Sequence, residues 1–187
     1  EIRLSLVGSE MCIRDRLKLI NDILELSRIE SGRMSFAFDD CSLNELLEEI
    51  YQTHHLLMPS NIRFLKEFQE MELIIHVDRF RFTQVITNFI NNAVKFTTKG
   101  HILLGTVYKK EEKEVHVFVE DTGKGMSEEA QKKVFERFFK VDEFAQGTGL
   151  GLSICQTIAE RLEGRITLSS QEGKGSRFTL IIPCRPK

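Results

Sequence analysis

Hydrophobic residues recur at helical spacing near the start of the chain. Leu17, Ile20, Ile23 and Leu24 lie three or four residues apart along one side, and Leu26 widens the stripe. This pattern predicts an amphipathic helix. A terminal helix with so broad an apolar stripe needs a partner to cover it, and a helical bundle would supply one.

The rest of the chain alternates between helical and strand patterns. Ser42 and Glu45 have the spacing of a capping box, which satisfies the first amides of a helix, and 39–42 reads as a turn. Helices are expected over 43–57, 79–96, 128–135 and 150–162, and strands over 62–68, 72–77, 101–108, 114–121, 165–169 and 176–182. Neighbouring strands joined by hairpin turns imply a mixed, largely antiparallel sheet with helices on one face. The predicted fold class is therefore α/β (α+β), a two-layer sandwich preceded by one bundle helix.

The composition is that of an ordinary globular protein, with 41% hydrophobic and 29% charged residues. The 187 residues suffice for one domain with an appendage. Because 26 Lys and Arg face 28 Asp and Glu, the net charge of -2 gives no electrostatic reason to bind nucleic acid or an anionic membrane. The four cysteines lie far apart without a C-x-x-C pair, so we expect reduced thiols of a cytosolic protein rather than a zinc site or a redox pair.

The first residues fit nothing that follows them. Residues 1–16 support neither a helix nor a strand, and we expect them to be a translated cloning or sequencing scar. The sequence starts at Glu1 rather than at a Met, which leads us to expect a piece of a longer protein.

Three asparagines gather near the end of the helix predicted over 79–96. Asn88 and Asn92 are four residues apart and share a helical face, which Lys95 continues, while Asn91 lies beside it. Asn is a poor residue for a helix interior because its amide competes for backbone hydrogen bonds. One explanation is a solvated face or a buried amide network. The other is an oxygen ligand for Mg²⁺ together with a lysine for phosphate.

A carboxylate and two glycines end the strand predicted over 114–121. Asp121 continues the alternation of three valines in this strand, so its side chain is expected to point into the buried layer. A carboxylate there must accept hydrogen bonds or shift its pKa, and an adenine amino group would be a suitable donor. Gly123 and Gly125 would let the backbone approach a ligand closely. An ordinary strand-ending turn explains the same residues.

Aromatic and cationic residues share the segment 135–140. Phe135 and Phe138 would pin a loop to the core while Arg137 or Lys140 reaches phosphate oxygens. A local hydrophobic cluster is an equally good explanation of this spacing.

Alternating glycines stand directly before the last predicted helix, in the order Gly147, Thr148, Gly149, Leu150 and Gly151. Glycines that lead into a helix N-terminus present free N–H groups and a positive dipole end to an anion. The dinucleotide fingerprint does not apply, because no strand precedes the segment and the last glycine of G-x-G-x-x-G is missing.

The order of these four signals resembles that of the catalytic ATP-binding domain of sensor histidine kinases, within the superfamily of gyrase, heat-shock chaperone and mismatch-repair ATPases. The resemblance covers 37–187, while 17–33 resembles the second helix of the family's dimerisation and phosphoacceptor domain. It implies ATP and Mg²⁺ as cofactors, phosphoryl transfer to a histidine, and a cytoplasmic location, with membrane anchoring of the parent left open.

The resemblance assigns roles residue by residue. Asn92 matches the Mg²⁺-binding residue of the N box, Asn88 the polar position one turn earlier, and Lys95 the lysine on the phosphate side. Asp121 matches the carboxylate that reads the adenine amino group. The other matches would contact the nucleotide, namely Gly123 and Gly125 of the first glycine box, Phe135, Arg137, Phe138 and Lys140 of the F box and ATP lid, and Gly147, Thr148, Gly149, Leu150 and Gly151 of the second glycine box.

Asn88 bears on the type of reaction. Hydrolytic members of the superfamily carry at this position a Glu that activates water, and an amide is not a base. The resemblance therefore favours phosphoryl transfer to a protein His, which depends on positioning and charge neutralisation.

The phosphoacceptor is expected outside this chain. The family's His lies in an H-x-x-x-x-P segment on the first bundle helix, upstream of Leu17, and structural or surface roles are favoured for His54, His55, His76, His101 and His116. The implied partners are a response regulator receiver domain, the phosphoacceptor helix of the same or the partner protomer, and a second copy in a homodimer, but no nucleic acid. A serine/threonine kinase of the same superfamily and a non-catalytic nucleotide-responsive module remain the alternatives.

Overall fold

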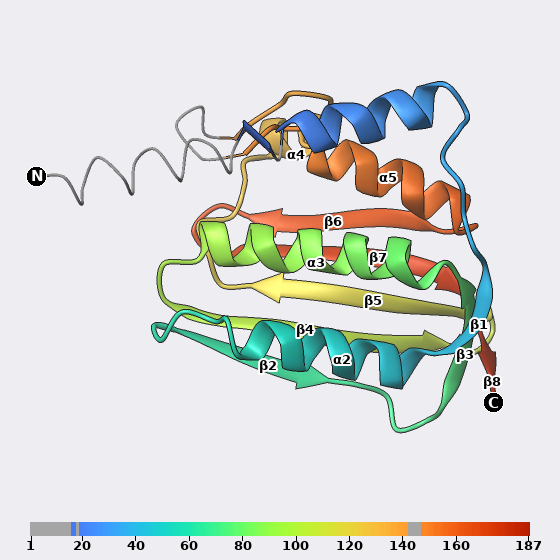
Figure 1. The fold of residues 1–187 in the computed structure, drawn as a ribbon. Helices are drawn as coiled ribbons and strands as arrows, with labels where there is room; N and C mark the ends of the chain where they lie inside the picture. The colour runs from blue at the N-terminus through green and yellow to red at the C-terminus, as the bar shows by residue number, and fades with distance from the viewer. Residues whose placement is uncertain (1–15, 18, 142–146) are drawn as a thin grey trace, which may run out of the picture.

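The computed structural model describes residues 16–17, 19–141 and 147–187. A helix over 16–30, described except for residue 18, precedes the sheet and lies beside α5 (Gly151–Arg161) (Figure 1). The leader predicted over 1–16 falls outside the described residues except for its last one, which is helical. Among the helices described, none is long and apolar enough to cross a membrane.

A five-stranded sheet forms one layer of the fold, with its strands in the order β2-β4-β5-β7-β6. Its strands are β2 (Ile62–Glu67), β4 (Gly100–Lys109), β5 (Glu114–Asp121), β7 (Gly175–Pro183) and β6 (Arg165–Gln171). Only the β2–β4 pair is parallel, and the other three pairs are antiparallel. This confirms the predicted mixed, largely antiparallel sheet.

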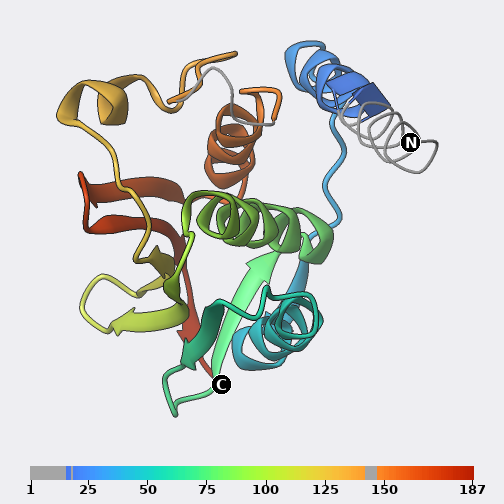
Figure 2. The ribbon, with the colours of Figure 1, turned by 90° about the vertical axis from the view of Figure 1, so that its left-hand side faces the viewer.

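Helices cover one face of this sheet, as the two views at right angles show (Figures 1 and 2). They are α2 (Leu43–His55), α3 (Arg79–Phe96) and α5, while the short α4 (Glu128–Lys133) lies in the segment that leads toward α5. Side chains fix where two of them begin, because Ser42 accepts a hydrogen bond from the amide of Glu45 and Asp78 accepts one from the amide of Arg81. The two-layer prediction is confirmed.

A second, three-stranded sheet was not predicted. It has the order β1-β3-β8, with β1 (Asp39–Ser42), β3 (Leu73–Val77) and β8 (Arg185–Pro186). The predicted turn over 39–42 is wrong, because these residues pair antiparallel with β3 and become a strand through a partner distant in sequence. The neighbouring strands β2 and β3 also enter different sheets, since β2 pairs in parallel with β4.

The core lies between the sheet and the helices. The alternating residues Val115, Val117 and Val119 of β5 are at most 1% exposed, as their pattern predicts. From α3, Phe89 is fully buried and stacks on Phe178 of β7, with 5.4 Å between ring centroids. This contact joins the centre of α3 to the centre of the sheet.

Truncation of this contact should destabilise the fold strongly. We expect Phe89→Ala to cost about 3–5 kcal/mol of unfolding free energy, because it removes a large buried ring and leaves a cavity. Phe80→Ala, at a 70% exposed position of the same helix, should cost less than about 1 kcal/mol. Urea unfolding of both variants measures the difference, and equal losses would contradict this account of the core.

Candidate functional site

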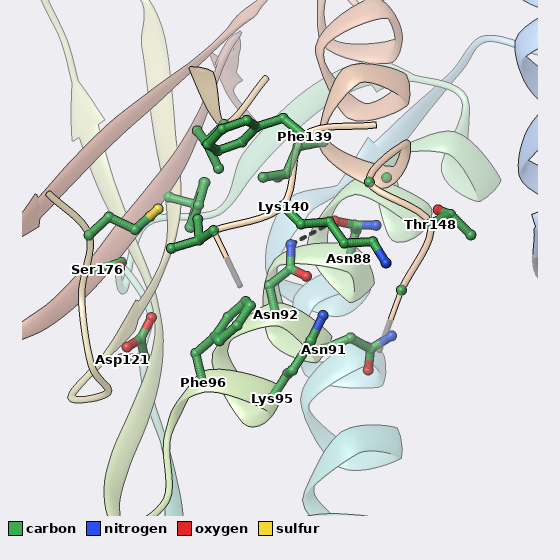
Figure 3. Close-up of a pocket in the computed structure, with 18 of the residues that line it drawn as sticks. Asn88, Asn91, Asn92, Lys95, Phe96, Asp121, Phe139, Lys140, Thr148 and Ser176 are labelled. Carbon is green, nitrogen blue, oxygen red and sulfur yellow. Dashed lines mark hydrogen bonds between the residues drawn. The ribbon is translucent and has the colours of Figure 1, made fainter. Parts of the chain in front are cut away.

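A cavity opens where the end of α3, the end of β5 and the segment before α5 meet (Figure 3). Ten of the residues predicted for the site line it: Asn88, Asn92, Lys95, Asp121, Gly125, Lys140, Gly147, Thr148, Gly149 and Gly151. In the view of Figure 3, Asp121 lies on one side of the cavity and Thr148 on the other, with Asn92 between them. The residues of four separate sequence motifs thus surround one space.

The asparagines of α3 form an ordered pair. The amide nitrogen of Asn92 donates to the side-chain oxygen of Asn88 at 3.0 Å (Figure 3). This bond fixes the Asn92 side chain and leaves its amide oxygen as the group that it offers to the cavity. Lys95, one turn further, lies close to the glycine segment, since its Nζ is 3.2 Å from where a Cβ of Gly147 would be. The helix therefore offers one hard oxygen and one cation to the same space.

Asp121 lies at the opposite side, at the end of β5. It is only 6% exposed, and its carboxylate accepts a hydrogen bond from the amide of Gly123 at 2.8 Å. Burial raises the pKa of the Asp121 carboxyl, and hydrogen bonds from the amides of Gly123 and Ser176 offset part of this rise. The predicted inward direction of this side chain is confirmed.

Gly123 and Gly125 permit close contacts between backbone segments, and Gly125 also lines the cavity. A Cβ on Gly123 would lie 2.3 Å from the carbonyl oxygen of Phe96, and one on Gly125 would lie 2.0 Å from that of Gln171. Gly125 also has a φ of +64°, which favours glycine, and it lines the cavity. Gly123 does not line it, so its structural effect is the close approach of β5 to the end of α3.

The second glycine segment brings a helix N-terminus to the cavity. The N-cap residue of α5 is Leu150, whose side chain makes no capping hydrogen bond, so it does not take up the first N–H groups of the helix. Gly149 has a φ of +72°, and a Cβ on Gly151 would lie 2.5 Å from the side-chain Nδ2 of Asn88. Glycine at these positions therefore permits the turn and the close packing of α5 on α3.

The loop after α4 differs most from its prediction. Only Lys140 of the four predicted residues lines the cavity, together with Phe139, which was not predicted. Phe135 packs edge-on against Phe178, Phe138 is 61% exposed, and Arg137 forms an ion pair with Glu30. Leu150 is also absent from the lining, because it is fully buried in the core.

Several lining residues were missed by the sequence reasoning. They are Asp22, Asn91, Phe96, Lys124, Met126, Val134, Phe139, Val141, Leu152, Ser176 and Phe178. Lys124 and Met126 lie within the first glycine motif, so that motif was a signal for them. Ser176 reaches the cavity through its pairing with Asp121 across β5 and β7, and no local pattern reveals such a pairing.

One histidine has a spacing that the sequence reasoning did not note. His54 stands five residues before Pro59, as in the acceptor motif of the family that the sequence resembles. Its helix, however, ends at His55, and its Nε2 lies 3.3 Å from Oγ1 of Thr87 on α3. Burial lowers the pKa of the His54 imidazole. The ring is thus half-buried at a helix end, which is consistent with the structural role expected for it.

A metal at this site would need ligands from a bound molecule. Among the described residues, no group of three or more His, Cys, Asp or Glu is placed to hold an ion. The amide oxygen of Asn92 fits Mg²⁺ as one hard, neutral ligand, and phosphate oxygens would complete such a site.

The family described as "Histidine kinase-, DNA gyrase B-, and HSP90-like ATPase" matches residues 77–186. Among curated relatives, Histidine protein kinase 1 of Candida albicans is 37% identical over 89% of this chain, and Sensor histidine kinase WalK of Bacillus subtilis is 30% identical over 89%. The aligned parts are 7% and 28% of those proteins, so the chain spans a small share of their lengths.

Solved structures give the same assignment. Full-length ShkA in complex with AMPPNP superposes with a TM-score of 0.85 at 26% identity, covering 100% of this chain and 40% of that one. The catalytic domain of histidine kinase ThkA superposes with a TM-score of 0.65 at 35% identity, covering 79% and 95%. The resemblance inferred from the sequence is confirmed: the chain belongs to the histidine kinase-, DNA gyrase B- and HSP90-like ATPase family and carries the catalytic ATP-binding domain of its sensor histidine kinase members.

Proposed function

We propose that this chain binds Mg²⁺·ATP and transfers the γ-phosphoryl group to a histidine on a helical bundle domain, as the catalytic part of a two-component sensor histidine kinase. The observation that carries the proposal is the meeting of Asn92, Lys95, Asp121 and Gly149 around one cavity. The similarity to ShkA, which was solved with AMPPNP, supports a nucleotide as the ligand.

The two sides of the cavity suit the two ends of ATP. On one side, the buried carboxylate of Asp121 would accept a hydrogen bond from the exocyclic amino group of adenine. On the other side, Lys95, Lys140 and the N-terminus of α5 would hold the phosphates. The oxygen of Asn92 would bind Mg²⁺, whose charge would offset that of the phosphates during transfer.

Asn88 favours transfer over hydrolysis. Its amide oxygen accepts the hydrogen bond from Asn92, so it orients the proposed metal ligand. An amide carries no basic site that would take a proton from water. In this site, therefore, the reaction rests on positioning and charge neutralisation, with an acceptor side chain supplied from outside the cavity.

The N-terminal helix supports a bundle as the acceptor. We assign 17–33 to the second helix of a dimerisation and phosphoacceptor domain and 37–187 to the catalytic domain. Leu17, Ile20, Ile23 and Leu24 are 46–56% exposed, which leaves the predicted apolar stripe largely uncovered. Its partners would be a second copy and the helix that carries the acceptor His, and a response regulator receiver domain would take the phosphoryl group onward.

Asn92→Ala should remove Mg²⁺-dependent nucleotide binding. Loss of the amide oxygen should weaken binding of a non-hydrolysable ATP analogue by about a hundredfold, because a metal ligand contributes several kcal/mol. Adenosine affinity should stay unchanged, which shows that the variant is folded. Titration calorimetry with and without Mg²⁺ makes the measurement, and an unchanged affinity for the analogue would remove Asn92 from the site.

Asp121→Asn should weaken ADP binding by roughly 10–100-fold, because a hydrogen bond to a charged acceptor is lost. The ionised carboxylate accepts this bond much more strongly than the protonated carboxyl does, and because its pKa is raised, the carboxyl becomes half protonated at a pH above the ordinary value of 3.8. ADP affinity of the wild type should therefore fall on acidification while the pH is still above 3.8. The matched control is Glu120→Gln, one residue earlier on the opposite face of β5. A pH dependence that persists in Asp121→Asn would assign the titration to another group.

Phosphoryl transfer should occur to an added bundle domain. With γ-labelled ATP, the chain should label a separate histidine kinase bundle domain and label itself little. The label should be acid-labile, because phosphohistidine is hydrolysed in acid and phosphoserine is not. Acid-stable label would favour the serine/threonine kinase alternative, and strong self-labelling that is lost in His54→Gln would make His54 an acceptor.

A further inference from the structure

The helix over 16–30 is docked on the catalytic domain by side chains in its middle. Glu25 forms an ion pair with Arg81 of α3 and accepts a hydrogen bond from Gln84 at 2.7 Å. Both partners of the Glu25–Arg81 pair are less than 20% exposed. Leu26 and Ile29 pack against the hydrophobic core. The contact is therefore a built interface that combines charge and apolar packing.

One carboxylate of this helix enters the candidate site. Asp22 lines the cavity and accepts a hydrogen bond from the hydroxyl of Thr148 at 2.6 Å. Thr148 stands between Gly147 and Gly149, and its hydroxyl also accepts a bond from the amide of Leu150 at 3.3 Å. Asp22 thus lies against the backbone segment to which the proposed function assigns the phosphates.

A carboxylate at this place repels a phosphate group. Two like charges a few ångströms apart and partly shielded from water disfavour each other more than they would in solution. Phosphates held by the glycine segment and Lys95 would lie close to the side chain of Asp22. Because the ion pair of Glu25 and the packing of Leu26 and Ile29 hold Asp22 in position, the repulsion acts on the docking of the whole helix.

We propose that Asp22 couples the phosphate site to the helix over 16–30, so that a docked helix weakens phosphate binding and a bound nucleotide weakens the docking of the helix. The inference rests on the proposed function, since it needs a nucleotide in the cavity. By thermodynamic reciprocity, the factor by which docking lowers nucleotide affinity equals the factor by which nucleotide lowers docking. Asp22 thus acts on nucleotide affinity through its charge and on the docking of the helix that carries it.

Two other roles of Asp22 make different predictions. If its bond to Thr148 only stiffens the glycine segment, removal of its charge should leave phosphate affinity unchanged or lower. If Asp22 binds Mg²⁺, removal of its charge should weaken Mg²⁺·ATP. Asp22→Asn distinguishes these roles, because asparagine keeps an oxygen that accepts from Thr148 and loses only the negative charge.

The test is titration calorimetry on the chain as it stands. ADP, ATP and adenosine are each titrated first in EDTA and then with Mg²⁺. We expect Asp22→Asn to bind ADP and ATP in EDTA about 5-fold or more tightly than the wild type does. Adenosine, which has no phosphate, should bind both equally. Glu160→Gln, a charge removal at an exposed position late in α5, should change neither affinity.

A double-mutant cycle tests the coupling itself. Glu25→Ala weakens docking from the α3 side, away from the glycine segment, and it should also tighten ADP binding. This gain should vanish in the Asp22→Asn background, where the helix no longer carries the opposing charge. In the wild type, ADP should speed hydrogen exchange of the helix over 16–30, and in Asp22→Asn it should have a smaller effect.

The outcomes distinguish a failure of the proposed function from a failure of the inference about Asp22. If neither ADP nor ATP binds any variant, the proposed function fails and the inference fails with it. If both bind and Asp22→Asn shows equal or weaker affinity in EDTA, the inference is overturned and the proposed function stands. Additive effects of Glu25→Ala and Asp22→Asn would likewise overturn the coupling.

Discussion

The close contact between the end of α3 and the end of β5 is the constraint on which the site depends. The carbonyl oxygen of Phe96, at the last residue of α3, accepts a hydrogen bond from the amide of Lys124 at 3.2 Å. It would also lie 2.3 Å from a Cβ on Gly123, so only glycine permits this approach. The contact ties the helix that carries Asn92 to the strand that carries Asp121. Together with the packing of Phe89 on Phe178, it holds the two chemically distinct sides of the cavity at a fixed distance, so a ligand that needs both meets a preorganised site.

Bonds between side chains then determine what each side of the cavity offers. The Asn88–Asn92 hydrogen bond uses one donor and one acceptor within the pair, which turns two adaptable amides into a single oriented oxygen. Neither amide of this pair carries a basic site that would take a proton from water, and this links the local geometry to the proposed class of reaction. On the far side, the burial of Asp121 makes its charge costly, and hydrogen bonds from the amides of Gly123 and Ser176, together with the side chain of Thr97, offset part of that cost. A donor on a bound ligand would therefore meet a carboxylate with unused capacity to accept hydrogen bonds.

The sequence predicted those features that depend on local periodicity. Alternation along β5 gave both the buried valines and the inward direction of Asp121, and helical spacing placed Asn88 and Asn92 on one face of α3. It failed where a distant partner decides the structure. The segment 39–42 is a strand because β3 pairs with it. Phe139 rather than Phe138 lines the cavity, in a stretch where Phe138 has a φ of +64° and its amide donates to the carbonyl oxygen of Gly149. Asp22 enters the site only through tertiary docking of its helix, which no spacing within 17–33 encodes.

The docked helix also bears on how an open anion site stays ordered. Donors that gather at a helix N-terminus cost free energy when they lack an acceptor, because they lose water without gaining a partner. Thr148 links one such donor to an anion, since its hydroxyl accepts from the amide of Leu150 and donates to the carboxylate of Asp22. Asp22 thereby supplies from within the chain the negative charge that a phosphate would otherwise bring. Binding of a nucleotide at this place is then an exchange of one anion for another. Its net affinity falls below what its contacts alone would give, because part of the binding free energy is used to displace Asp22 and weaken the docking of its helix.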